Sequence, residues 1–162
     1  MSISEQQETK EKYYSEAIRY MDNAKECLKK AQKDNFMYHD QKYVRMACGT
    51  AYSGLLVALD CFFILKGVHG PNTKKIRKSI EYYQKKLTDE NKKLRGHLNI
   101  AYQNLHLFGY YDGAQGVHLI KEGFDNAYAI IDQIKPTGLN GSSQNAEQGK
   151  TAKSVHTTKQ KS

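Results

Sequence analysis

Apolar side chains recur every three or four positions through most of the chain, which is the spacing of a helix that buries one face. In the first segment the members of this stripe are Tyr14, Ala17, Met21, Ala24, Leu28 and Ala31. Charged residues such as Glu16, Arg19 and Asp22 fill the positions between them and indicate a solvated opposite face. The pattern therefore predicts an amphipathic helix of about five turns.

The second segment, from about Asp40 to Lys66, is apolar on most of its sides. Between Met46 and Leu65 its only charged residue is Asp60. A membrane span needs about twenty apolar residues, and this run nearly reaches that length. Its hydroxyl side chains, the absence of aromatic belts and the amphipathic helices around it favour the central helix of a bundle instead. A carboxylate in this run is costly unless it is paired. We therefore expect Asp60 at the end of the bundle or bonded to a tyrosine hydroxyl of another helix, a structural role favoured over a catalytic one.

Gly67 and Pro71 end this helix, and Thr73 is the expected N-cap of a third one. A heptad-like seam follows, made of Ile76, Ile80, Tyr83, Leu87, Leu94, Leu98, Ala101, Leu105 and Phe108. The seam lapses at Glu90 and Asn91, where Thr88 or Asp89 could cap a new helix. Two helices are favoured over a single long one.

Gly109 and Gly113 are expected to end this stretch, and a last helix then follows. Its apolar face consists of Val117, Ile120, Phe124, Ala127, Ile131 and Ile134. No segment alternates with a period of two, so nothing indicates a sheet. We predict an all-α, antiparallel four- to five-helix bundle over residues 12–135, a flexible N-terminus over 1–11 and a disordered tail over 136–162.

Positive charge is concentrated in one part of the 162-residue chain. The net charge is +8, and residues 71–96 carry nine Lys and Arg against three Asp and Glu. The Lys-rich tail is read as solubilising. Three Cys without a CxxC pair fit a reduced cytoplasm. The start, MSISEQQETKEK, has no apolar stretch, so we expect no secretory signal and a cytoplasmic location.

The usual signatures of cofactor and metal chemistry do not occur in the sequence. It has no Gly-rich phosphate loop, no HExxH and no Glu-x-x-His. The six His are scattered without metal-ligand spacing, and the three Cys lie among apolar neighbours, as inert buried thiols do. We therefore expect no metal and no cofactor.

A first candidate site follows from the run HLFGYYDG at a helix end. Its members are His106, Tyr110, Tyr111 and Asp112. Two glycines bracket these side chains and could form a small cleft, in which His106 would serve as acid or base and Asp112 would orient it. The alternative is a helix end whose tyrosines pack against the neighbouring helix.

A second candidate is the basic segment, which could bind phosphates. Its first cations are Lys74, Lys75, Arg77 and Lys78. Tyr82 and Tyr83 are interleaved with the later ones and could stack on unpaired bases. The alternative is a solvated helix face.

The hairpin adds a resemblance. A Tyr-rich first helix is followed by YVRMACGTAYSGLLVALDCFF, in which small residues permit close helix approach. With the later LNIAYQNLHLFGYYDG, this resembles the HEPN superfamily and, closer still, a bacterial family of uncharacterised domains with a HEPN-like bundle. The resemblance implies a cytoplasmic helical bundle that is often dimeric.

In the ribonuclease members of that superfamily an Arg is followed after four to six residues by a His. No Arg of this chain has a His at that spacing, and the nearest approximation is Lys92 with His97. We therefore predict a non-catalytic HEPN-like binding module, homodimeric, with RNA or a protein such as a toxin or nucleotidyltransferase as partner. The alternative is a degenerate metal-independent ribonuclease that uses Lys92, His97 or His106. A purely structural oligomer stays open as a third class.

Overall fold

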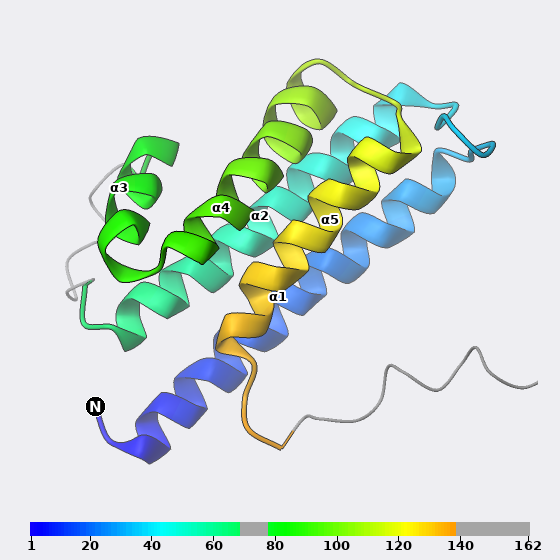
Figure 1. Ribbon diagram of the computed structural model, residues 1–162. Helices are drawn as coiled ribbons and strands as arrows, with labels where there is room; N and C mark the ends of the chain where they lie inside the picture. The colour runs from blue at the N-terminus through cyan, green and yellow to red at the C-terminus, as the bar shows by residue number, and fades with distance from the viewer. Residues whose placement is uncertain (69–77, 139–162) are drawn as a thin grey trace, which may run out of the picture.

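The computed structural model describes residues 1–68 and 78–138, which form an all-α bundle without a strand in those ranges. Its helices are α1 (Ile3–Lys30), α2 (Gln41–Leu65), α3 (Ile80–Glu90), α4 (Lys92–Ala101), the π-helix η2 (Tyr102–Tyr111), α5 (Val117–Ile131) and the short 3-10 turn η3 (Asp132–Ile134). Helices α1, α2, α4 and α5 run antiparallel along the bundle, while α3 lies at one end (Figure 1). The predicted all-α bundle is confirmed.

The first helix begins much earlier than its apolar stripe does. The hydroxyl of Ser2 accepts a hydrogen bond from the amide of Glu5, and the Glu5 carboxylate accepts one from the amide of Ser2. This reciprocal capping box satisfies two of the amides that a helix start leaves unpaired. The prediction of a flexible segment over residues 1–11 is therefore wrong, because helix α1 starts at Ile3.

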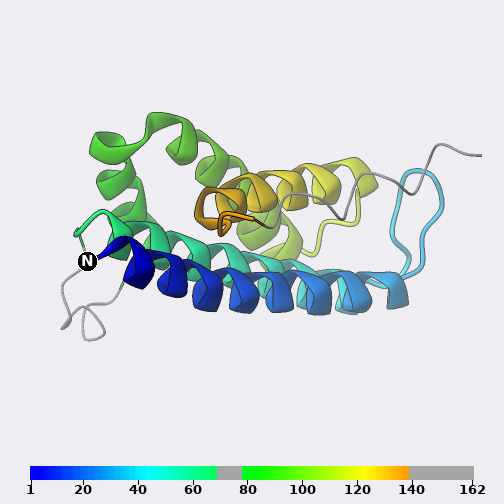
Figure 2. The same ribbon diagram turned by 90° about the horizontal axis from the view of Figure 1, so that it is seen from below.

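Helix α2 is the central helix, buried on most of its sides. It approaches α1 closely at Gly54, where an added Cβ would lie 2.9 Å from the Cβ of Tyr20. By length and composition α2 would also qualify as a membrane span, but 56% of its most apolar stretch is buried inside the bundle. Figure 2 shows α1 and α2 as one layer, with α4, η2 and α5 packed over it.

The end of α2 has the geometry expected of a glycine stop. Gly67 has a φ of +69°, its amide donates to the carbonyl of Ile64, and the amide of Val68 donates to that of Phe63. These two bonds are a Schellman motif, which only a residue that tolerates positive φ permits cheaply. Thr73, the expected cap of the next helix, lies outside the described residues. In the described part, α3 begins at Ile80 behind Ser79.

The break in the long seam is confirmed, and its cap is a different residue from the two predicted. Asn91 accepts a hydrogen bond from the amide of Leu94 through its side-chain oxygen and starts α4. Thr88 and Asp89 are still inside α3, where the Thr88 hydroxyl donates to the carbonyl of Gln84. Helix α3 continues to Glu90, so Asn91 is the first residue after it that can cap α4.

Most members of the predicted stripes lie in the core. Its members from the last three long segments are Tyr83, Leu87, Leu94, Leu98, Ala101, Leu105, Ile120, Phe124, Ala127, Ile131 and Ile134. The half-buried exceptions in the stripes are Tyr14, Leu28, Ile80, Phe108 and Val117, and Ile76 lies outside the described residues. Helix α4 leads directly into η2, so one rod carries the seam from Leu94 to Leu105. Of the predicted disordered tail, residues 139–162 lie outside the described residues.

Candidate functional site

The most distinctive side-chain cluster outside the core surrounds His106. Its ring stacks on Tyr52 of α2 at 4.6 Å between ring centroids and on Tyr102, one turn earlier, at 5.3 Å. Tyr110 stacks on the same ring at 6.0 Å, and Tyr111 meets it edge-on at 5.0 Å. Tyr110 and Tyr111 are 45% and 60% exposed, so the cluster opens to solvent.

The wide helix η2 holds three of these rings in line. Tyr102, His106 and Tyr110 are spaced by four residues, which places them above one another along the helix. Gly109 on the inner side is buried, and an added Cβ there would lie 2.7 Å from the Cβ of Cys48 and closer still to its sulfur. The prediction that Gly109 ends the helix is wrong, since Gly109 lies inside η2 where it contacts α2. Such π-helical turns are frequent at functional sites.

Burial controls the protonation of this cluster. Partial burial lowers the pKa of His106, which favours the neutral ring at neutral pH. Burial, with smaller contributions from Tyr102 and Glu81, raises the pKa of Tyr52 far above its usual value. The cluster therefore presents uncharged aromatic faces.

Arg45 of α2 fixes the end of η2. Its Nη1 donates to the carbonyl of Tyr110 at 2.9 Å and also to that of Tyr111. The following turn has Gly113 at a φ of +67°, and the side chain of Gln41 donates to its carbonyl at 3.0 Å. A guanidinium on the last carbonyls of a helix satisfies orphan acceptors and complements the helix dipole.

A line of cations leads toward the aromatic rings on the same rod. Arg95, Tyr102 and His106 are separated by seven and then four residues, which is one face of a helix. Lys92, three residues before Arg95, continues this face toward the start of α4. Arg95 and Lys92 are exposed and have no carboxylate partner within the described residues. We call Lys92, Arg95, Tyr102, His106 and Tyr110 the basic-aromatic stripe.

Two predicted site residues have other surroundings. Asp112 is exposed and makes no hydrogen bond to His106, because a residue six positions further on is not a whole number of turns away. Lys78 pairs with Asp60 at 2.9 Å, and the hydroxyl of Tyr83 donates to the same carboxylate oxygen at 3.0 Å. The predicted tyrosine partner of Asp60 is thus confirmed, while Lys78 is already engaged in this pair. The other predicted cations, Lys74, Lys75 and Arg77, lie outside the described residues.

His97 and His106 belong to different faces of the α4–η2 rod. Nδ1 of His97 is 2.7 Å from Oδ1 of Asn126 on α5, whereas His106 stacks against α2. Nδ2 of Asn126 donates to the carbonyl of Glu122, which directs Oδ1 of Asn126 at the imidazole, so that Nδ1 of His97 is the donor in this bond. Since the two imidazoles face different helices, they do not form an acid–base pair within one chain.

The thiols and potential metal ligands give no reactive centre in the described part of the chain. Burial raises the pKa of Cys48 and of Cys61 to about 12, which keeps both as neutral thiols. Cys27 is half-buried, and its sulfur lies 3.6 Å from the carbonyl oxygen of Tyr43. Across residues 1–68 and 78–138, no three His, Cys, Asp or Glu side chains gather as metal ligands.

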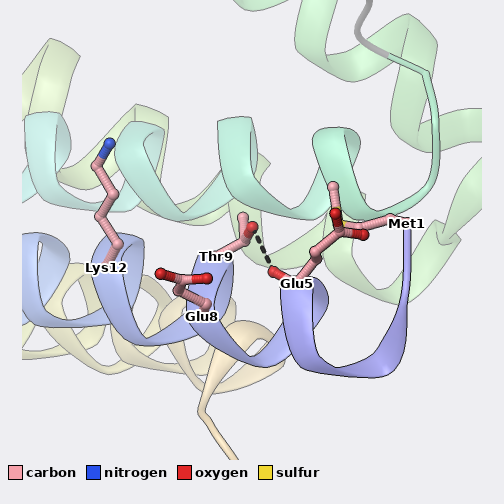
Figure 3. Close-up of a pocket in the computed structure, with 5 residues that line it drawn as sticks. All are labelled: Met1, Glu5, Glu8, Thr9 and Lys12. Atoms are coloured by element: carbon pink, nitrogen blue, oxygen red, sulfur yellow. Dashed lines mark hydrogen bonds between the residues drawn. The ribbon is translucent and has the colours of Figure 1, made fainter.

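A hollow of about 600 Å³ lies beside the start of α1. Its lining residues are Met1, Glu5, Glu8, Thr9 and Lys12. Four of them come from the first turns of α1, and Met1 lies two residues before it; the bond between Thr9 and Glu5 stays within that helix (Figure 3). Because one helix cannot surround a ligand, the His106 cluster is the better candidate site.

Three residues of the cluster were missed from the sequence. Tyr102 could have been found, since it precedes His106 by the same four residues that separate His106 from Tyr110. Tyr52 and Arg45 carry no such signal, because they reach the cluster from α2 through the tertiary fold.

Comparison with known proteins gives a family and a fold. A family model described as "Domain of unknown function (DUF5618)" matches residues 12–136. Among solved structures, a protein of unknown function from Dyadobacter fermentans is 36% identical, with a TM-score of 0.66 over 77% of this chain and 94% of that one. No curated protein matches the chain.

Proposed function

The chain belongs to the DUF5618 family of unknown function, and we propose that it is a non-catalytic binding module for single-stranded RNA. The basic-aromatic stripe carries this proposal. Proteins that bind single-stranded nucleic acid combine cations along the backbone with aromatic rings on which bases stack. Here exposed Lys92 and Arg95 lie on the same helical face as the rings of Tyr102 and His106.

The exposed rings at the end of the stripe provide the stacking surface. Tyr110 and Tyr111 are open to solvent, yet both are held by ring contacts, at 6.0 and 5.0 Å from His106. Arg45 fixes their backbone through the two carbonyls. Preorganised rings lose little conformational entropy when a base stacks on them. The neutral His106 ring behind them adds aromatic surface without adding charge.

The separation of the histidines supports binding over cleavage. A metal-independent ribonuclease needs an acid and a base on either side of one phosphodiester. His97 is bonded to Asn126 between α4 and α5, and His106 is stacked on the α2 side, so a single chain does not bring both to one phosphate.

An RNA-binding titration of the full chain tests the proposal. Fluorescence anisotropy with a labelled single-stranded RNA of about 12 nucleotides would be measured in EDTA at two salt concentrations. The Tyr110→Ala/Tyr111→Ala variant should bind at least about tenfold more weakly, because each lost stack is worth about 1–3 kcal/mol. The matched Tyr110→Phe/Tyr111→Phe variant keeps both rings and should bind like the parent chain.

The cations are tested separately by the salt dependence. Replacing Arg95 with Gln should weaken binding and reduce the slope of log Kd against log salt by about one. Equal affinity in the parent and Ala variants would contradict the proposal, as would the absence of any RNA affinity at low salt. RNA cleavage that is lost in His97→Ala or His106→Ala would establish the ribonuclease alternative instead.

The proposal extends to architecture and location. The resemblance of the α1–α2 hairpin to HEPN-like bundles supports a homodimer in the cytoplasm, which sedimentation velocity and cell fractionation would test. A monomer at all accessible concentrations would contradict the proposed dimer but not the proposed RNA-binding surface.

A further inference from the structure

A groove runs between α1 and α5, on the other side of the bundle from the contact of α2 with η2. Two adjoining hollows of about 380 and 300 Å³ form it. They share Lys25, Leu28, Lys33 and Tyr38 as lining residues, so they are two parts of one feature. None of these residues belongs to the basic-aromatic stripe.

The floor of the groove is apolar. It consists of Leu28, Tyr38, Val117, Ile120, Phe124 and Tyr128. At one end the loop between α1 and α2 adds two exposed apolar side chains, Phe36 at 70% and Met37 at 47% exposure. The carbonyl of Phe36 accepts the amide of Val117 at 2.8 Å, which attaches this loop to the start of α5. Tyr38, Ile120 and Phe124 are at most 8% exposed, so the accessible apolar surface comes from half-buried Leu28, Val117 and Tyr128 together with Phe36 and Met37. Apolar surface rimmed by polar groups is where protein partners associate.

The rim of the groove is cationic, and part of it is uncompensated. The ammonium of Lys25 lies over the Tyr128 ring at 4.7 Å, and that of Lys33 over the Tyr38 ring at 5.8 Å. Neither has a carboxylate within salt-bridge distance among residues 1–68 and 78–138. By contrast, Lys29 pairs with Glu26 and Lys121 pairs with Asp125, at 2.8 and 2.7 Å.

We propose that this groove docks an acidic amphipathic helix of a partner protein. Apolar side chains spaced by three and four residues would enter the floor, and carboxylates beside them would pair with Lys25 and Lys33. The lining of α5 from Val117 to Tyr128 is about 16 Å long, which matches a helix of about three turns. The charge of the rim favours acidic over basic partners through both affinity and encounter rate.

The groove and the RNA surface lie on different elements. The groove floor combines aliphatic Leu28, Val117 and Ile120 with the rings of Tyr38, Phe124 and Tyr128. The ammonium groups of Lys25 and Lys33 already lie over the rings of Tyr128 and Tyr38, at 4.7 and 5.8 Å. Apolar side chains of a helix gain from burial beside this floor. The proposal therefore does not depend on RNA binding and can fail or succeed separately from it.

A designed peptide tests the docking. The probe is a capped, fluorescent peptide of about 14 residues with leucines at helical a and d spacing and glutamates beside them, titrated into the full chain. We expect saturable binding, with methyl shifts at Leu28 and Val117 in NMR spectra. Lys25→Glu/Lys33→Glu should weaken it by about tenfold, since two ion pairs become repulsive.

A matched variant separates docking from general attraction to a basic protein. Lys85→Glu/Lys93→Glu changes the net charge equally on exposed positions of α3 and α4 and should leave the affinity for the peptide unchanged. Thermal melts establish that both variants fold. The proposal is overturned if both variants lose affinity equally, or if a Gln-for-Glu peptide binds equally well. Displacement of the peptide by single-stranded RNA, or a homodimer that only Lys25→Glu/Lys33→Glu dissociates, would also overturn it.

Discussion

Replacing Gly109 with Ala changes a single methyl group at the closest contact between η2 and α2. The new Cβ would lie 2.7 Å from the Cβ of Cys48, 3.0 Å from the carbonyl oxygen of Asn104, and closest of all to the Cys48 sulfur. Carbon atoms do not approach one another to this distance, so η2 or α2 has to move. Movement of η2 displaces the His106 cluster, because Tyr102, His106, Tyr110 and Tyr111 all belong to η2.

The expected magnitude follows from two opposing effects. Ala is favoured over Gly in a helix interior by about 1 kcal/mol, while overpacking of a core costs about 1–3 kcal/mol. The net loss should be up to about 2 kcal/mol in the free energy of unfolding. Gly96→Ala supplies the matched control, because no atom lies within 4 Å of its added Cβ. That variant should gain up to about 1 kcal/mol.

Urea denaturation of four chains measures the effect: the parent, Gly109→Ala, Cys48→Ala and the double variant. Removing the sulfur of Cys48 relieves the worst of the contact and leaves the Cβ contact in place. The double variant should therefore be more stable than the sum of the single effects predicts, by about 1 kcal/mol. If the two effects simply add, or if Gly109→Ala is as stable as Gly96→Ala, the close approach does not restrict residue 109 and the reasoning fails.

Three further outcomes can be measured on the same chain. Because burial lowers the pKa of His106, the unfolded chain binds a proton there more readily than the folded one, so stability should fall as the pH drops through about 6.5. His106→Phe keeps the stack and should flatten this dependence in urea titrations between about pH 5 and 8; an unchanged slope would assign it to other groups. Tyr83→Phe removes the hydroxyl bonded to Asp60 and should cost about 1 kcal/mol of unfolding free energy, while an Asp60→Asn background should shrink that cost. Arg45→Ala leaves the carbonyl of Tyr111 without its cap, and faster amide hydrogen exchange should appear in the last turn of η2 but not in α5.

Features of the fold that depend on local periodicity were predictable. Ala17, Met21 and Ala24 are buried as their spacing indicates, because a helix with one apolar face removes that face from water by packing it against the bundle. The N-terminal turn was misjudged because the short-range signal of Ser2 and Glu5 outweighs the lack of apolar residues there. The cap at Asn91 was missed because Thr, Asp and Asn are all good caps, and only the length of α3 selects among them.

The site was harder to predict because its geometry comes from tertiary packing. Gly109 of the π-helix lies against Cys48, a contact between residues far apart in sequence, and local propensity contains no such information. The pairing of Arg45 with the carbonyl of Tyr110 likewise spans 65 residues. His106 and Tyr110 were found from their own chemistry, but the ring from Tyr52 that completes their stack required the fold.

The relation between core and site on the α4–η2 rod adds to the contacts of Tyr52 and Arg45 in positioning these rings. Four of the five members of the basic-aromatic stripe follow a buried residue by one position: Arg95 follows Leu94, Tyr102 follows Ala101, His106 follows Leu105, and Tyr110 follows Gly109. One position is about 100° of rotation in the α-helix α4 and somewhat less in the wider η2, so these residues lie at the edge of the interface that the seam buries. Tyr102 and His106 are accordingly half-buried rather than fully exposed. Packing of the seam therefore sets the direction in which the stripe faces.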